Sequence, residues 1–289
     1  MTDLTRRELL PGMLSLGLGV GGALGPGSVA AAHHAMADAA PAWADDPAAN
    51  LRNLVRMQGS LDEEDVRWWF NGVIFAVQGE TQTPKPLFRF EGMEVYWFSH
   101  QRDGYFLGGN TVTFFRNLTT GRFLQQFANP ITGETNTPKP SVQGGTLGFK
   151  YTTHGIWPAR YSGEPLGPVP QQPLRLQWQT AGDQVWLQHQ TVYPPGMPPL
   201  HGQQQSLFAN RRDFDNRRIK SLSTVFSSTV FMGWFKWMNM AARPGHLVWH
   251  ASGAKLGSID DLPREYRERA EREYPQRMTA KPVGLATNS

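Results

Sequence analysis

Histidine side chains titrate near neutral pH, and two of the eight histidines in this chain, His154 and His189, stand in contexts that suit proton transfer. His154 lies where a β-rich run ends in a proline-rich loop, close to Tyr151 and Arg160. Catalytic groups are common on loops at strand ends. We therefore expect His154 to act as an acid or base, and Tyr151 and Arg160 to orient a substrate or stabilise developing negative charge. A rim histidine that only faces water explains the pattern equally well.

His189 lies in a run, 184–193, in which residues alternate in polarity as in a strand. The alternation places His189 on the less polar face, together with Val185 and Leu187. An ionisable ring on such a face predicts a second acid or base, which would exchange protons with His154. The other interpretation is a core histidine that is hydrogen-bonded to a neighbour.

The ten tryptophans supply large apolar rings, and four of them stand in segments suited to the wall of a ligand site. Trp157 opens a proline-rich loop, Trp178 lies in a β-rich run, and Trp234 and Trp237 lie in the very apolar stretch 231–240. We expect these four rings to hold a flat, hydrophobic ligand. Core packing is the alternative for all four, and a membrane-facing lip is a further alternative for 231–240.

Several chemistries lack the residues that they need. The chain has no cysteine, which excludes disulfides, cysteine-ligated clusters and cysteine nucleophiles. It has no Gly-x-Ser-x-Gly turn, no His-Glu-x-x-His motif and no glycine-rich loop placed to cradle phosphate. We expect no metal and no cofactor, with histidines from separate strands as an alternative route to a metal site. The net charge of +4 comes without a basic stripe, so we expect no nucleic-acid partner.

The elements that must position these residues are mainly β. Short runs rich in β-branched and aromatic residues follow one another, separated by turn residues at the spacing of antiparallel sheets. The runs are 66–77, 87–90, 93–100, 111–117, 123–127, 147–153, 174–180, 184–193, 206–210 and 222–230. Helical spacing predicts short helices at both ends, over 48–57 and 264–273, and a capping box at 60–63 predicts one further helical turn. The fold class is therefore mainly β, an antiparallel meander that forms a barrel or a sandwich.

Two features of the loops leave alternatives open. The octapeptide Gly-Glu-Thr-Gln-Thr-Pro-Lys-Pro at 79–86 recurs with one change at 133–140, which indicates either a duplicated half or two similar proline-stiffened turns. The proline-rich segments 157–173 and 193–199 are either lids over a site or plain connections.

The start of the chain has the form of an export signal. The twin-arginine pair Arg6-Arg7 precedes a weakly apolar, glycine-rich run, and small residues at 35–37 offer a cleavage site, with 30–32 as a second candidate. Residues 1–37 are therefore expected to form a twin-arginine signal peptide that engages the twin-arginine export machinery. A single domain, 38–289, would remain and act in the periplasm or outside the cell.

Three motifs in order carry a family resemblance. Asn129-Pro130-Ile131-Thr132-Gly133-Glu134 follows an aromatic run, Tyr193-Pro194-Pro195 follows the His189 run, and 234–240 is followed by Pro-Gly-His-Leu-Val-Trp-His at 244–250. Together they resemble the bacterial and fungal family called domain of unknown function 1838, over roughly 50–263. The resemblance implies no general reaction and no agreed catalytic residues. Tyr193-Pro194-Pro195 departs from the more usual Tyr-Pro-Asn, which puts any role for that loop in doubt.

These observations lead to three hypotheses of different classes. The first is a metal-free lyase or isomerase that acts by proton transfer on a hydrophobic aromatic or terpenoid-like small molecule. The second is a non-catalytic carrier or sensor of a hydrophobic ligand, which predicts tight binding without chemical change. The third is a histidine-ligated metalloenzyme. No feature of the sequence fixes an oligomeric state.

Overall fold

A computed structural model describes residues 41, 43–79, 83–145, 147–192, 200–240 and 242–280. The expected signal peptide with its cleavage sites, the segment 193–199 and part of the first octapeptide lie outside the described residues. Among those described, no helix is both long enough and apolar enough to span a membrane.

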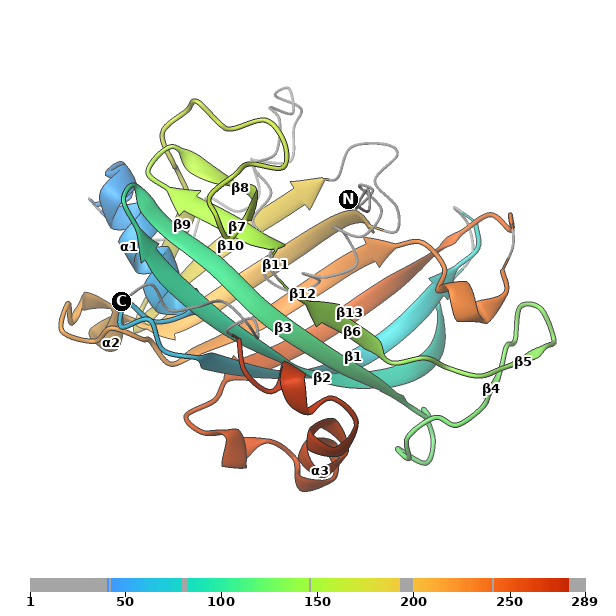
Figure 1. The fold of residues 1–289 in the computed structure, drawn as a ribbon. Coiled ribbons are helices and arrows are strands. Elements are labelled where there is room, and N and C mark those ends of the chain that lie inside the picture. Colours follow the sequence, from blue (N-terminus) through green and yellow to red (C-terminus); the bar gives the residue numbers. More distant parts are fainter. Residues whose placement is uncertain are drawn as a thin grey trace.

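The fold is mainly β, as predicted, with eleven strands in one antiparallel sheet. Its order is β8-β7-β3-β2-β1-β13-β12-β11-β10-β9, and β6 pairs with β3. The sheet curls strongly into a trough (Figure 1), and its edge strands β8 and β9 share no ladder in the described part of the chain, so the barrel is open. The strands are β1 Val66–Val77, β2 Lys85–Gln101, β3 Gly104–Arg116, β6 Ser141–Gly144, β7 Leu147–Thr152, β8 Gly155–Arg160, β9 Gln177–Ala181, β10 Gln184–Val192, β11 Leu200–Asn210, β12 Thr224–Met232 and β13 His246–Lys255, with β4 Phe127–Ala128 and β5 Thr135–Asn136 forming a separate small sheet.

Helix α1, Pro47–Gln58, fills one end of the trough (Figure 1). Asp46 caps its first turn by accepting a hydrogen bond from the Ala48 amide, and a proline stands at its first position. Its apolar face, including Leu54 and Met57, is fully buried against the inner face of the sheet. The prediction of a helical entry is confirmed, whereas the further helical turn expected at 60–63 is wrong: Ser60 Oγ accepts from the Asp62 amide in a simple turn.

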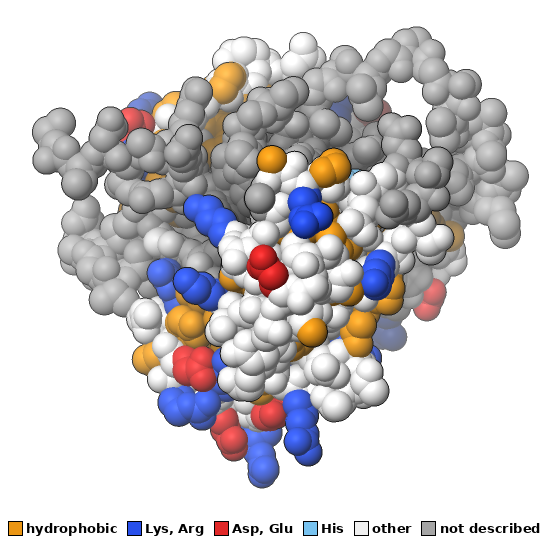
Figure 2. All heavy atoms as spheres, turned by 90° about the vertical axis from the view of Figure 1, so that its right-hand side faces the viewer, with side chains coloured by type: hydrophobic (Ala, Val, Ile, Leu, Met, Phe, Trp, Pro, Cys, Tyr) orange, Lys and Arg blue, Asp and Glu red, His pale blue; other side chains and the backbone are white. Residues whose placement is uncertain are grey.

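The other end of the trough is closed by the segment 233–240, which contains the short 3-10 helix η2, Lys236–Met238. Phe235 in this segment packs against the aromatic rings of Phe88 on β2, Phe115 on β3 and Trp249 on β13. Figure 2 shows the molecule from this end, with acidic and basic side chains gathered at the lower edge, where α3 lies, and further charged side chains scattered over the middle of the face.

Helix α3, Arg264–Glu273, lies on the outer, convex face of β2 and β3 (Figure 1). Tyr266 and Ala270 are fully buried there, against Met93 and Val112 among others. The prediction of a helix over 264–273 is therefore confirmed, and this charged helix braces the sheet through a narrow buried stripe. Because α3 covers the outer face, the middles of β2 and β3 are buried on both faces.

Four strands were not expected from the sequence: the short strands β5 and β6, and the longer strands β8 and β13. β8 carries Pro158, which an edge strand tolerates because its free side needs no ladder hydrogen bond. β13 contains Ala251, Ser252 and Gly253, which have low strand propensity, yet it pairs with β1 and β12 at the centre of the sheet.

Candidate functional site

The β7–β8 hairpin carries four of the predicted site residues but does not bring them together. His154 is exposed in the turn between the strands, where its Nδ1 lies 3.4 Å from Thr153 Oγ1. Arg160 lies at the opposite end of the hairpin and pairs with Glu164 at 3.3 Å. The full length of β8 therefore separates His154 from Arg160.

Tyr151 and Trp157 lie on opposite faces of this hairpin. Tyr151 points to the inner face, where it is fully buried and meets Phe98 edge-on at 5.1 Å between ring centroids. Its hydroxyl has no hydrogen-bond partner among the described residues, and burial raises the pKa of Tyr151 far above its ordinary value. Trp157 packs on the outer face with Phe106 and Ala159. Trp157 thus faces away from any site on the inner face.

Trp178 belongs to the packing around α1. Its Nε1 donates to Asn50 Oδ1 at 2.6 Å, and its ring meets Trp43 and Phe214 edge-on at 5.0 and 5.4 Å. With an exposed fraction of 3%, the ring is part of the core at that end. Core packing, the alternative given for this residue, accounts for its position.

Trp234 and Trp237 lie at the other end of the trough. Trp234 Nε1 donates to the Arg243 carbonyl at 3.1 Å. Trp237 stacks on Phe235 at 5.4 Å and belongs to a continuous aromatic cluster. The cluster consists of Phe88, Phe90, Phe115, Phe127, Phe235, Trp237 and Trp249. These rings form a wide apolar wall at one end of the inner face.

His189 lies on the inner face of β10, half-buried, as the alternation predicted. Gln205 is opposite it on β11, and Ser228 follows on β12, so the three side chains form one row across the sheet. Small residues continue this row, with Ala251 on β13 and Gly72 on β1. The inner face around His189 therefore carries polar and small side chains.

The neighbouring positions extend this polar band. Gln203, Gln205 and Ser228 have exposed fractions of only 2%, 2% and 3%. Ser228 Oγ and, one row away, Trp249 Nε1 have no hydrogen-bond partner among the described residues. Leaving such buried groups unsatisfied costs about 1–3 kcal/mol each. The band is therefore poised to receive a molecule that offers polar groups.

Glu94 on β2 is a candidate that sequence reasoning missed. It is fully buried on the inner face, where Tyr96 donates to its Oε2 at 2.6 Å and Thr111 Oγ1 lies 3.4 Å from its Oε1. A buried carboxylate among aromatic rings is costly, and such groups are concentrated at functional sites. The alternation of residues in β2 could have identified Glu94, because it places Glu94 on the same face as Phe90 and Phe98.

Comparison with family models gives one match, over residues 63–142 and 202–286, which together make up more than half of the chain. The matching model is described as a protein of unknown function, DUF1838. The chain belongs to the DUF1838 family. The resemblance seen in the sequence is thereby confirmed, and no curated protein and no solved structure matches the chain.

The segments that match DUF1838 contain most of these buried polar side chains. Glu94 lies in the first segment, and Gln205 and Ser228 lie in the second. His189 and the β7–β8 hairpin lie between the two segments. Most of the site residues predicted from the sequence therefore lie in a part of the chain that the DUF1838 model does not cover.

The polar band of this DUF1838 protein offers groups for acid–base chemistry. Glu94 supplies a carboxylate and His189 an imidazole on the same inner face, and the register places Glu94 in the row of Trp68, four residues along the strands from the row of His189. Within the described ranges, no three His, Asp or Glu side chains are grouped closely enough to hold a metal ion. The inner face thus combines neutral hydrogen-bonding groups with apolar rings, which are the groups that can hold a small organic molecule.

Proposed function

We propose that this protein binds a small hydrophobic molecule, aromatic or terpenoid-like, on the inner face of the trough and acts on it by proton transfer, as a lyase or isomerase. The observation that carries the proposal is the group of buried polar side chains on the inner face, Gln203, Gln205 and Ser228 near His189 and Glu94 farther along the sheet, within a face otherwise made of aromatic and aliphatic side chains.

Binding follows from the two kinds of surface on this face. The aromatic cluster that includes Trp237 and Trp249 supplies apolar area, which favours rings and hydrocarbon skeletons. The polar band requires at least one hydrogen-bonding group on the ligand, because Ser228 Oγ and Trp249 Nε1 have no partner among the described side chains. A skeleton with one carbonyl or hydroxyl group meets both requirements.

Proton transfer needs a base and an acid, and Glu94 and His189 fill these roles in the proposal. One of them takes a proton from a carbon next to the ligand's carbonyl group. The other returns a proton, either to a second carbon, which gives an isomer, or to a leaving hydroxyl group, which gives an alkene and water. Both outcomes balance without an oxidant, a reductant or a further reactant.

His154, Tyr151 and Arg160 remain predicted catalytic residues, but the proposal gives them less weight. His154 is exposed in a turn and Arg160 is engaged with Glu164. Tyr151 is the exception, because its buried hydroxyl faces inward and has no partner among the described residues. It is therefore retained as a group that orients the ligand.

Native mass spectrometry of the mature protein, purified from the periplasm of its own host, tests this proposal. We expect a bound organic molecule that is converted on incubation, with conversion reduced at least tenfold in Glu94→Gln and His189→Gln and unchanged in the control His250→Gln, whose side chain is exposed on the outer face of β13. A molecule that stays bound without change would overturn the enzyme and support a carrier or sensor. A stoichiometric metal ion would support the metalloenzyme instead.

The proposed place of action is the periplasm or the cell exterior, reached through the twin-arginine export machinery. The support is the sequence Thr5-Arg6-Arg7-Glu8-Leu9-Leu10. Replacing Arg6 and Arg7 by lysine should retain the protein, uncleaved, in the cytoplasm. Cell fractionation and immunoblotting measure this, and export of the double variant at the wild-type level would overturn the assignment.

A further inference from the structure

The outer face of the strands from β9 to β13 differs from the rest of the surface because it lacks formal charge. Its described side chains include no Lys, Arg, Asp or Glu, in a chain with 28 basic and 24 acidic residues. The outward-facing residues, identified by alternation with the buried inner ones, are mostly amides and hydroxyls, with two histidines, some small residues and a few larger apolar side chains such as Trp186, Phe208 and Val225.

These side chains are ordered in rows that run across the strands. One row is apolar: Trp186, Phe208, Val225, Ala254 and, on β1, Trp69. The next row along the strands carries only amides and hydroxyls: Gln188, Ser206, Ser227, Ser252 and Asn71. Trp186 and Trp69 are four strand spacings apart, which is about 19 Å.

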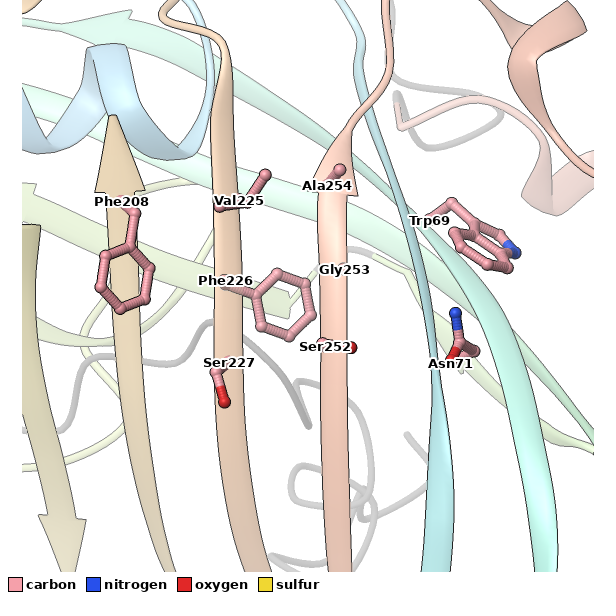
Figure 3. Close-up of a pocket in the computed structure, with 9 residues that line it drawn as sticks. All are labelled: Trp69, Asn71, Phe208, Val225, Phe226, Ser227, Ser252, Gly253 and Ala254. Atoms are coloured by element: carbon pink, nitrogen blue, oxygen red, sulfur yellow. The ribbon is translucent and has the colours of Figure 1, made fainter. Parts of the chain in front are cut away.

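A shallow groove of about 430 Å³ follows these two rows from β11 to β1. Figure 3 shows Phe208, Val225 and Ala254 on adjacent strands, with Ser227 and Ser252 next to them. Gly253 forms part of the floor. A Cβ at this position would lie only 2.5 Å from Phe226 Cε1, which favours glycine there. Val225, with 51% of its surface exposed, is one of only three large apolar side chains exposed in the described residues, and Phe231 on the same face is another.

We propose that this groove binds a neutral polysaccharide, with the chain of sugars lying along the rows from β10 to β1. Sugar rings present apolar C–H faces that pack on aromatic and aliphatic side chains such as Phe208 and Val225. Their hydroxyls exchange hydrogen bonds with amides and hydroxyls, which the adjacent row supplies. The absence of charge on the face matches an uncharged polymer, because no charged side chain loses its hydration on binding.

The shape of the face favours a polymer over a second copy of this chain. The sheet is strongly convex on this side (Figure 1), so two such faces meet over a narrow strip. A stable dimer buries roughly 800 Å² on each partner. The amide and hydroxyl row would also lie at the centre of that contact, where protein interfaces are most apolar. A sugar chain bends along a curved surface and brings its own hydroxyl partners.

Binding of purified oligosaccharides to the mature protein tests the proposal, with isothermal titration calorimetry as the measurement. The probes are cellopentaose, chitopentaose and maltopentaose, and oligogalacturonate of the same length is the charged comparison. We expect at least one neutral pentasaccharide to bind and the charged one to bind at least tenfold more weakly.

Variants localise the binding to the groove. Ser227→Asp places a charge in the amide and hydroxyl row without removing any packed ring, and Phe208→Ala removes one sugar platform. Both should weaken binding at least tenfold. Val169→Ala, which alters the exposed apolar residue outside this face, is the matched control and should bind as the wild type does. Glu94→Gln should also bind normally, because the inner face is a separate site.

Three results would overturn the proposal. The first is that no neutral pentasaccharide binds the wild type at millimolar concentration. The second is binding that Ser227→Asp and Phe208→Ala both leave unchanged. The third is a dimer in sedimentation velocity that dissociates in Ser227→Asp, which would assign the face to a second copy of the chain.

Discussion

The Tyr96 hydroxyl donates a hydrogen bond to Glu94 Oε2 at 2.6 Å, and the two side chains leave β2 two residues apart toward the inner face. Tyr96 thereby fixes the orientation of a carboxylate that is fully buried. Hydrogen bonds to charged groups are about twice as strong as those between neutral groups. The pair is therefore a structural unit as well as a candidate functional one.

Tyr96→Phe should lower the free energy of unfolding by about 1.5–3 kcal/mol, because it removes a hydrogen bond to a buried charge. In Glu94→Gln the same Tyr96→Phe change should cost about 1 kcal/mol less, because the acceptor is then neutral. Urea unfolding of the two single variants and the double variant measures this coupling. Tyr105→Phe is the control, since no hydrogen bond of its hydroxyl to a described residue is found. Additive effects would show that the pair is not coupled.

Lys255 at the end of β13 joins the sheet to α1. Its Nζ donates to the carbonyls of Arg56 and Gly59, at 2.9 and 3.0 Å, and lies 3.4 Å from Ser221 Oγ. Burial lowers the pKa of Lys255 from its ordinary value to about 7. The unfolded chain keeps the ordinary pKa, so between pH 7 and 10 it binds more protons than the folded protein does. Stability should therefore rise with pH over this window.

The Lys255→Met variant should show a weaker dependence of stability on pH than the wild type. Lys255 should contribute up to about 1.4 kcal/mol per pH unit to the rise of the unfolding free energy between pH 7 and 10. Urea unfolding at several pH values measures it, and Lys220→Met, which alters an exposed lysine, is the control. Equal slopes in wild type and Lys255→Met would contradict the lowered pKa.

Arg56 holds the segment between β11 and β12 against α1. Its guanidinium makes five hydrogen bonds, four of them to backbone carbonyls in 213–219, and only 1% of the residue is exposed. Arg56→Met leaves those carbonyls without their donor, so we expect a loss of about 3–5 kcal/mol in unfolding free energy. Arg52→Met on the exposed side of α1 should cost less than about 0.5 kcal/mol. Similar losses in both variants would refute this role of Arg56.

The sequence predicted those strands and helices whose alternation of apolar and polar residues can be seen within the element itself. β1 and α3 lie where their patterns placed them, over Val66–Val77 and Arg264–Glu273. In β1 the buried residues alternate with partly exposed ones along most of the strand, and in α3 only a narrow stripe is buried. Each element buries a single face, and a single buried face produces the regular spacing of apolar residues from which strands and helices are predicted.

Glu94 and β13 escaped prediction for reasons that lie in tertiary structure. Because α3 covers the outer face, β2 is buried on both sides and reads as a nearly continuous apolar run, in which Glu94 resembles an exposed break. β13 pairs with β1 across about 180 residues of sequence, and no local pattern reports such a pairing. The site was predicted where loops and prolines are dense, whereas the buried polar groups lie mid-strand.

Tyr266 anchors α3 through its hydroxyl, which accepts from the Met93 amide at 2.9 Å and donates to the Val112 carbonyl at 2.7 Å. Met93 and Val112 are opposite each other on β2 and β3, so one hydroxyl satisfies a group on each strand. Tyr266→Phe keeps the packed ring but leaves both backbone groups buried without a partner, and should cost about 2–4 kcal/mol.

Tyr274→Phe near the end of α3 is the matched control for this variant. Tyr274 is only half-buried, and no hydrogen bond of its hydroxyl to the described residues is found, so its loss should cost less than about 0.5 kcal/mol. Burial raises the pKa of Tyr266 well above its ordinary value, so its hydroxyl keeps the proton that it donates at pH 10. Because the same hydroxyl ionises near pH 10 in the unfolded chain, the difference in unfolding free energy between wild type and Tyr266→Phe should fall by only about 0.4 kcal/mol between pH 7 and pH 10. A difference that vanishes at pH 10 would show that the hydroxyl titrates and is not held between the two strands.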